Sequence, residues 1–83
     1  MREPATAVDA YVGRRIAQAR RIVGMSQKKL AEKLGLTYGP IQHYERGRNR
    51  ICISRLYEIS IILQVPVSYF FEGLPGMRPP VKK

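Results

Sequence analysis

The sequence of 83 residues predicts an all-α fold, a compact domain of five short helices. Apolar residues recur at intervals of three and four positions through most of the chain, as they do along one face of a helix. Residues that cap helices precede these segments, and glycines follow most of them. No segment alternates apolar and polar residues as a half-buried strand does, except residues 51–53, which are too few to count.

The first helix is expected at residues 10–23. Asp9 is the expected N-cap, because its carboxylate can accept hydrogen bonds from the free amides of the first turn. Gly24 should end the helix, since glycine adopts the left-handed conformation of a helix terminus at little cost. Residues 1–8 contain a proline and small residues, so we expect a flexible leader before a domain that begins at residue 9. The inward stripe is Val12, Ile16, Ala19 and Val23.

The second helix is expected at residues 27–34, with Ser26 as its N-cap and Gly35 as the residue that ends it. All of its residues are good helix formers. Its inward stripe is Leu30, Ala31 and Leu34.

The third helix is expected at residues 38–46, with Thr37 as its N-cap and Gly47 after its end. Pro40 is tolerated because it lies in the first turn, where amides have no partner within the helix. The residues expected to face inward are Ile41 and Tyr44.

The fourth helix is expected at residues 55–63 with Ser54 as its N-cap, and a short fifth helix at residues 68–72. Pro66 separates the two, and the domain is expected to end at residue 74. Residues 75–83 contain two adjacent prolines and three basic residues, and we expect a disordered basic tail. The apolar face of the fourth helix is Leu56, Ile59, Ile62 and Leu63.

The charge of the chain favours a polyanionic partner. Fifteen Lys and Arg residues face six Asp and Glu residues, which gives a net charge of +9. A chain this basic gains affinity for nucleic acid by releasing condensed counterions, whereas a net charge of roughly 2–8 serves solubility alone. One cysteine cannot form a disulfide within the chain, and no apolar run is long enough for a signal peptide or a membrane span. We therefore expect a cytoplasmic protein with no membrane partner.

The spacing of the second and third helices is that of a helix-turn-helix. Ala31 is small enough for the helices to cross closely, Gly35 supplies the turn, and Ile41 packs back onto the second helix. A generic helical hairpin is the alternative interpretation. The flanking helices, the caps and the positive charge favour binding to DNA.

Three motifs resemble the XRE/Cro-type, lambda-repressor-like helix-turn-helix family. They are Gly24-Met25-Ser26-Gln27 with Leu30-Ala31, Ile41-Gln42-x-Tyr44-Glu45-Arg46-Gly47, and the stretch from Leu56 through Val65-Pro66-Val67-Ser68. The ending VPVSYFFEGL is similar to bacterial regulators of this family. The resemblance covers about residues 12–71 and implies a five-helix domain that binds double-stranded operator DNA, usually as a homodimer, with the third helix in the major groove.

The resemblance also implies which residues touch DNA. The expected base contacts are Thr37, Tyr38, Gly39, Gln42 and His43. The expected phosphate contacts are Gln27, Lys28, Arg46, Arg48, Asn49 and Arg50. A glutamine can pair bidentately with adenine, a contact worth about 1–3 kcal/mol of discrimination. His43 is alternatively a plain exposed polar residue.

The pair Gly39-Pro40 departs from the family pattern, which has polar reading side chains at these positions. Either the helix approaches the groove more closely here, or base reading depends on Tyr38 and Gln42. Tyr38 can pack on a thymine methyl group or donate its hydroxyl to a phosphate.

The resemblance places a partly buried ion pair between Arg20 and Glu45, which would link the first helix to the third. Cys52 follows a basic loop, where a half-buried apolar role is favoured over a redox sensor. The C-terminal helix commonly contributes to dimerisation in this family, so we expect a dimer contact there, with a role in the core alone as the alternative. The residues of that contact are Tyr69, Phe70, Phe71 and Leu74.

The sequence contains no pattern that indicates catalysis. It has no Ser/His/Asp set, no glycine-rich phosphate loop and no metal-spaced Cys/His cluster. We expect no catalytic residue, no bound metal, no cofactor and no small-molecule ligand. Two alternatives to a complete DNA-binding regulator remain: a protein-interaction or antitoxin-like adaptor with the same fold, and the DNA-binding half of a longer regulator.

Overall fold

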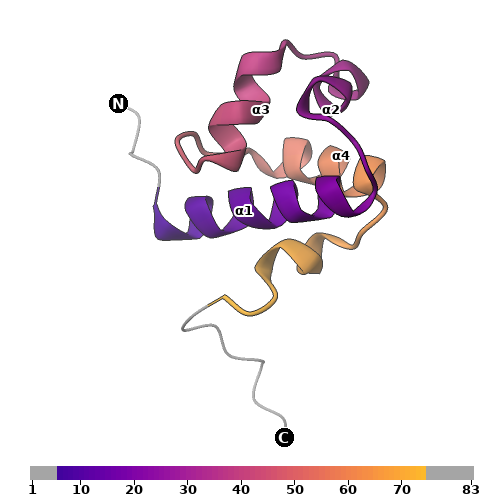
Figure 1. Cartoon of the computed structure of the whole chain (residues 1–83). Helices are drawn as coiled ribbons and strands as arrows, with labels where there is room; N and C mark the ends of the chain where they lie inside the picture. The colour runs from indigo at the N-terminus through magenta and orange to yellow at the C-terminus, as the bar shows by residue number, and fades with distance from the viewer. Residues whose placement is uncertain (1–5, 75–83) are drawn as a thin grey trace, which may run out of the picture.

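The computed structural model describes residues 6–74, which form four α-helices and one short 3₁₀ helix (Figure 1). The elements are α1 (Ala7–Ile22), α2 (Gln27–Leu34), α3 (Tyr38–Glu45), α4 (Ile53–Leu63) and η1 (Val67–Phe71). No strand occurs among these residues, so the predicted all-α class is confirmed. None of these helices has both the length and the apolar character needed to cross a bilayer. The basic tail predicted at 75–83 and residues 1–5 of the predicted leader lie outside the described residues.

The predicted short fifth helix is present as a 3₁₀ helix and not as an α-helix. The segment after Pro66 forms the 3₁₀ helix η1, which is five residues long and ends before Glu72. So short a segment gains few α-helical hydrogen bonds, and single turns of this kind are commonly 3₁₀. The aromatic residues of the segment nevertheless pack against the core.

Helix α1 begins three residues earlier than predicted, because Thr6 and not Asp9 is its N-cap. The Thr6 hydroxyl accepts a hydrogen bond from the Asp9 amide at 3.4 Å, and the Thr6 amide donates to the Asp9 carboxylate at 2.7 Å. This reciprocal pair is a capping box, in which Asp9 is the third residue of the helix. Ala7 and Val8, expected in the flexible leader, therefore form the first turn.

Helices α2 and α3 follow the prediction closely. The Ser26 hydroxyl accepts a hydrogen bond from the Lys29 amide at 3.0 Å, and Gly35 ends α2 in the left-handed conformation with φ 70°. Thr37 occupies the N-cap position of α3, although its side chain makes no capping hydrogen bond. The last residue of α3 is Glu45, one position before the predicted end.

Helix α4 begins at Ile53, two residues before the predicted start. Cys52 occupies the N-cap position, so the prediction of Ser54 as the cap is wrong. Ser54 is the second residue of the helix, and its hydroxyl lies 3.4 Å from the Cys52 sulfur. The extended backbone at Cys52 is what starts the helix, with no capping hydrogen bond from a side chain.

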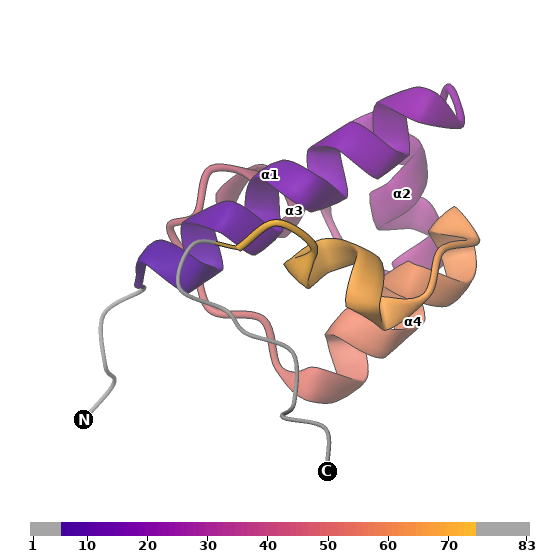
Figure 2. The ribbon, with the colours of Figure 1, turned by 90° about the horizontal axis from the view of Figure 1, so that it is seen from below.

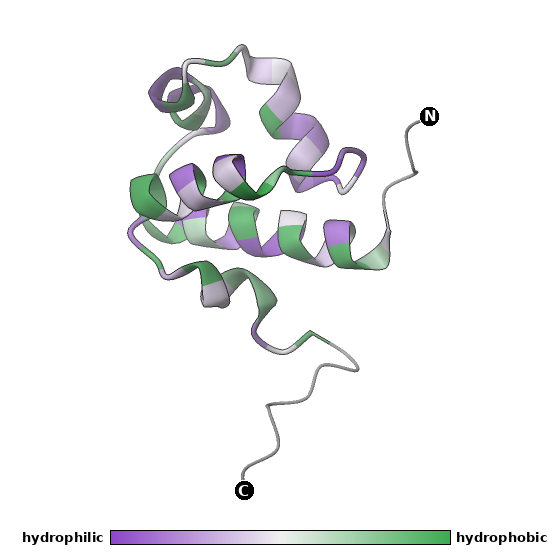
Figure 3. Ribbon diagram, turned by 180° about the vertical axis from the view of Figure 1, so that it is seen from behind, coloured by the Kyte–Doolittle hydropathy of each residue, from purple (hydrophilic) through white to green (hydrophobic). Residues whose placement is uncertain are grey.

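Every element contributes to one apolar core. Apolar and hydrophilic residues alternate along the helices (Figure 3), and buried apolar residues from every helix pack together in the core. Element η1 lies across α1 and α4 and closes the core on the side away from α3 (Figure 2). The large side chains that are fully buried are Ile16, Leu30, Ile41, Ile59, Leu63 and Phe70.

A glycine allows α1 to cross α3 at backbone contact distance. A Cβ atom added at Gly13 would overlap the carbonyl oxygen of Tyr44 and would lie 3.1 Å from that of Glu45. These atoms belong to the backbone of a helix, so they cannot turn aside as a side chain can. The absence of a side chain at Gly13 therefore sets the distance between the two helices.

We predict that Gly13→Ala lowers the free energy of unfolding by about 1–3 kcal/mol or more, where 1–3 kcal/mol is the usual cost of overpacking. Urea unfolding followed by circular dichroism measures this. The matched control is Gly39→Ala in α3, where an added Cβ meets no atom within 4 Å apart from its two chain neighbours. That variant should change the free energy of unfolding by less than about 1 kcal/mol, because alanine favours a helix whereas a side chain before Pro40 disfavours the helical backbone. A Gly13→Ala variant as stable as Gly39→Ala would show that α1 and α3 are not in tight contact at Gly13.

Candidate nucleic-acid interface

A buried ion pair joins α1 to α3. The guanidinium of Arg20 donates two hydrogen bonds to the carboxylate of Glu45, at 2.6 Å from Nε and 3.1 Å from Nη2. Both residues are buried. This bidentate geometry confirms the pair that the sequence resemblance implied, and the burial is more complete than expected.

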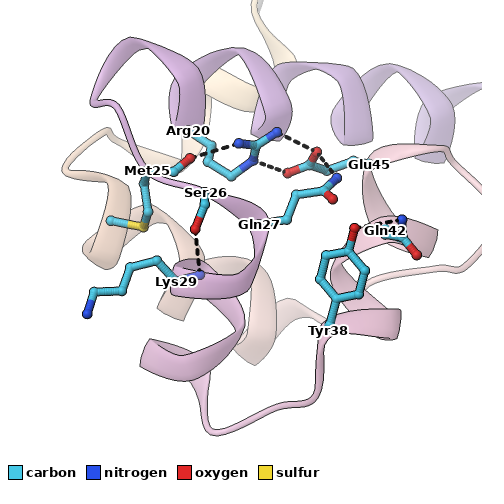
Figure 4. A network of polar contacts seen from close by, with 8 residues as sticks. All are labelled: Arg20, Met25, Ser26, Gln27, Lys29, Tyr38, Gln42 and Glu45. Carbon is cyan, nitrogen blue, oxygen red and sulfur yellow. Dashed lines mark hydrogen bonds and ion pairs between the residues drawn. The ribbon is translucent and has the colours of Figure 1, made fainter.

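Two further hydrogen bonds connect this pair to α2 (Figure 4). The Arg20 Nη1 atom donates to the carbonyl oxygen of Met25 at 2.7 Å, in the turn that leads into α2. Gln27, the first residue of α2, donates from Nε2 to Glu45 Oε1 at 2.9 Å. Arg20, Glu45 and Gln27 thus form one polar clamp that holds three helices in a single arrangement.

The outward face of α3 presents a pair of polar side chains. Gln42 donates a hydrogen bond from Nε2 to the hydroxyl oxygen of Tyr38 at 3.0 Å, one turn earlier on the helix. Tyr38 is 48% exposed. The amide nitrogen of Gln42 has a second hydrogen, so the side chain retains one donor and one acceptor for a ligand.

The other expected base contacts also lie on accessible surface. Thr37 and His43 are exposed, and Gly39 is half-buried. A Cβ atom added at Gly39 would meet no atom within 4 Å apart from its two chain neighbours. The surface beside Gly39 is therefore open, and a ligand can approach the backbone of α3 closely there.

The expected phosphate contacts divide into two groups. Lys28, Arg46 and Arg48 are exposed and Asn49 is half-buried. Arg50 forms an ion pair with Asp9 at 3.6 Å, and Gln27 belongs to the polar clamp. The first group is thus available to a ligand, whereas the side chains of the second group also hold the fold together.

A polar hollow of about 700 Å³ lies between α1, α2 and α3, and it includes residues that the sequence prediction missed. Arg14, Gln18 and Arg21 line it from α1. Their spacing of four and three positions puts them on one helix face. That spacing is visible in the sequence, but the sequence does not show which residues of α2 and α3 lie opposite this face. The remaining lining residues are Ala17, Gln27, Glu45 and Arg46.

One of the four residues of the expected dimer contact, Phe70, is not accessible to a partner. Phe70 has an exposed fraction of 0%, so its side chain offers no surface to a partner. Tyr69 is half-buried under Arg15, whose guanidinium carbon lies 3.9 Å from the ring centroid. Phe71 and Leu74 are half-buried as well.

An exposed apolar stripe runs along α4. Ile53, Tyr57 and Ile61 follow one another at intervals of four residues, and their exposed fractions are 88%, 59% and 59%. Residues spaced by four lie on the same face of a helix. Three of the seven large apolar side chains that are exposed among the described residues are therefore on one face of α4.

Cys52 is exposed, so the expectation of a half-buried apolar role is wrong. The hydrogen bond with Ser54 holds the pKa of the Cys52 thiol below its ordinary value, and the backbone N–H of Arg55 acts in the same direction. The positive charge of the Arg55 guanidinium also lowers the pKa of this thiol.

Comparison with known proteins identifies the family. The helix-turn-helix family HTH_3 matches residues 16–70, which include every element from the middle of α1 to η1. The chain belongs to this family. The match confirms the resemblance to XRE/Cro-type proteins.

Relatives of this helix-turn-helix chain include regulators that have not been characterised. One from Sinorhizobium medicae is 56% identical over 69 residues, which are 83% of this chain and 50% of the relative. A regulator from the ATPase CF(0) region of Rhodospirillum rubrum is 51% identical over 81% of this chain and 62% of its own length. The chain thus spans about half the length of the first relatives it matches.

Solved structures share the fold. The restriction-modification controller protein C.AhdI from Aeromonas hydrophila has a TM-score of 0.74 at 24% identity, over 80% of this chain and all of its own. The biofilm regulator SinR, solved in complex with DNA, has a TM-score of 0.67 at 32% identity, over 74% of this chain and 98% of its own. The first likeness supports the fold alone.

We predict that Glu45→Ala lowers the melting temperature strongly, because it leaves the Arg20 guanidinium buried without its partner. Breaking a buried pair in this way costs about 3–5 kcal/mol. The matched control is Glu32→Ala, which removes an exposed ion pair with Lys29 of 3.7 Å and should cost no more than about 1 kcal/mol. Differential scanning calorimetry of both variants measures the difference, and an unchanged melting temperature in Glu45→Ala would contradict the clamp.

Proposed function

We propose that the chain is a sequence-specific regulator of transcription that binds double-stranded DNA with α3 in the major groove. The observation that carries this proposal is the exposed Tyr38–Gln42 pair on the outer face of α3, beside a basic hollow. The inner face of the same helix is held by Ile41 and Glu45, so the outer face is presented in a fixed orientation. A rigid helix with polar groups on one side suits the reading of base edges.

The base-reading role falls mainly on two side chains. Gln42 offers an acceptor and a free amide hydrogen, the pair of groups that adenine needs. Tyr38 donates its hydroxyl or packs on a thymine methyl group, while Thr37 and His43 extend the contact at either end. The open surface at Gly39 supports a close approach of the helix backbone to the groove.

The phosphate contacts surround this reading face. Lys28 stands in the first turn of α2, and Arg46, Arg48 and Asn49 follow the end of α3. Gln27 has one amide hydrogen beyond the one it donates to Glu45, and that hydrogen serves a phosphate oxygen. Arg50 contributes charge to the same loop while it remains paired with Asp9.

The likeness to SinR supports this proposal, since SinR was solved with DNA and is 32% identical. A protein-interaction or antitoxin-like adaptor is the second candidate, which the exposed stripe on α4 favours. The two candidates differ in their affinity for a selected duplex: a regulator needs a high affinity for it, whereas an adaptor does not.

We also propose that the chain acts as a homodimer. The α4 stripe carries more exposed apolar surface than the C-terminal residues Tyr69, Phe71 and Leu74, which are partly used within the chain. Contiguous apolar patches of this kind mark contact surfaces. Two copies related by a two-fold axis would present two α3 helices to the two halves of a palindromic operator.

We predict that the chain binds a selected duplex at least about 10³-fold more tightly than a random one at physiological salt. Gln42→Ala should lose about 1–3 kcal/mol on the selected duplex and relax preference at one base pair, whereas Arg48→Ala should weaken both duplexes alike. Fluorescence anisotropy titrations at several salt concentrations test this. Equally weak binding of both duplexes by the wild type would favour the adaptor, and identical behaviour of the two variants would contradict the division of contacts.

We predict that Ile61→Glu weakens self-association by at least about tenfold, because it places a charge in the apolar contact of α4. Sedimentation equilibrium at several protein concentrations measures it. The control is Gln18→Glu, which adds the same charge at an exposed polar position of α1, away from α4. Leu74→Glu tests the contact expected from the sequence, and a loss of dimer in that variant alone would move the interface to the C-terminal segment.

A further inference from the structure

The polar hollow contains more positive charge than the expected phosphate contacts explain. Arg14 and Arg21 line it from α1, and Arg46 lines it from α3. Glu45 is the one acidic residue among the seven that line the hollow, and its carboxylate is already paired with Arg20. The hollow therefore presents a charge of three guanidinium groups that no carboxylate within it balances.

The arginines of α1 separate into two classes by their contacts. Arg20 holds Glu45, and Arg15 donates to the carbonyl oxygen of Tyr69 at 2.9 Å, so these two stabilise the fold. Arg14 and Arg21 are exposed, and neither forms an ion pair within residues 6–74. The guanidinium of Arg14 lies over the ring of Tyr11, at 5.6 Å from the centroid.

Placing like charges around one hollow opposes folding unless a ligand gains from them. The fold uses other arginines of α1 for its ion pairs, so Arg14 and Arg21 have no carboxylate partner among residues 6–74. A guanidinium group matches the oxygens of a phosphate bidentately, and several such groups around a hollow suit a polyanion.

The hollow is continuous with the proposed interface. Gln27 and Arg46, two of the proposed phosphate contacts, are part of its lining. Gln27 and Glu45 lie on the same side of the ribbon as the Tyr38–Gln42 pair, between α1 and the reading helix (Figure 4). A duplex that lies against α3 on this side therefore has a strand of its backbone next to the hollow.

We propose that Arg14 and Arg21 bind the phosphate backbone of the same duplex that α3 reads, so that α1 forms a third wall of the DNA interface. This inference rests on the proposed function. The contact carries no sequence information, because every base pair has the same phosphates. Its effect is on affinity and on the dependence of affinity on salt.

The test compares Arg14→Gln and Arg21→Gln with Lys33→Gln, a control that removes the same charge from the groove between α2 and α4. Dissociation constants for the selected and the random duplex are measured between 50 and 200 mM salt. Each arginine variant should weaken both duplexes by the same factor and should reduce the slope of log K against log salt by about 0.9. Thermal melting checks that all three variants remain folded.

Two outcomes would overturn the inference and leave the proposed function intact. The first is wild-type discrimination between the duplexes together with arginine variants that lose no more affinity and slope than Lys33→Gln. The second is binding of inorganic phosphate, measured by calorimetry, that disappears in both arginine variants while duplex affinity stays unchanged, since that result assigns the hollow to a free anion. Failure of the proposed function looks different, because the wild type itself would then bind both duplexes equally weakly.

Discussion

The arrangement of this domain depends on one buried interaction, the ion pair between Arg20 and Glu45. Two charges removed from water cost more than they return unless the geometry is good and the remaining polar atoms are satisfied. Here the pair is bidentate, the third guanidinium nitrogen donates to a backbone carbonyl, and Gln27 donates to the same carboxylate. The orientation of α3 relative to α1 and α2 follows from these directed bonds, which apolar packing alone does not specify.

The clamp works because the backbones it joins are already close. Gly13 brings α1 against the carbonyl groups at the end of α3, and Gly47 continues this contact. A Cβ atom at Gly47 would lie 2.8 Å from that of Ala10, and its φ of 72° is one that a side chain strains. The loop that carries Arg48 and Arg50 is therefore anchored to the first turns of α1. Both α3 and the loop after it are thus positioned by α1, α3 through a polar contact and the loop through a steric one.

Local signals predicted well the parts of the fold that depend on neighbouring residues. Both ends of α2 were predicted correctly from Ser26 and Gly35, because helix capping and the left-handed conformation of glycine depend on only a few adjacent residues. The start of α1 was missed although the capping box of Thr6 and Asp9 was in the sequence, because Asp9 alone is also a good cap. The role of Gly13 and the separation of the α1 arginines into two classes were not predictable, since both depend on contacts between elements far apart in the sequence. The resemblance to a family supplied the Arg20–Glu45 pair, which spacing alone does not reveal.

The proposed interface has many groups that would contribute to affinity for DNA and few that would contribute to sequence specificity. Positive charge is plentiful around the hollow and the loop after α3, but the outer face of α3 offers few groups for reading bases, because Gly39 has no side chain and Pro40 no amide hydrogen. Phosphate contacts raise affinity for any duplex, so each one adds to competition from random sites. In the proposed function, a single domain with this balance would discriminate poorly. Two domains that share one operator would double the number of base contacts and would restrict binding to sites with the correct spacing. The small reading surface proposed for α3 and the dimer contact proposed on α4 would then be two parts of one requirement, which a second copy of the chain would meet.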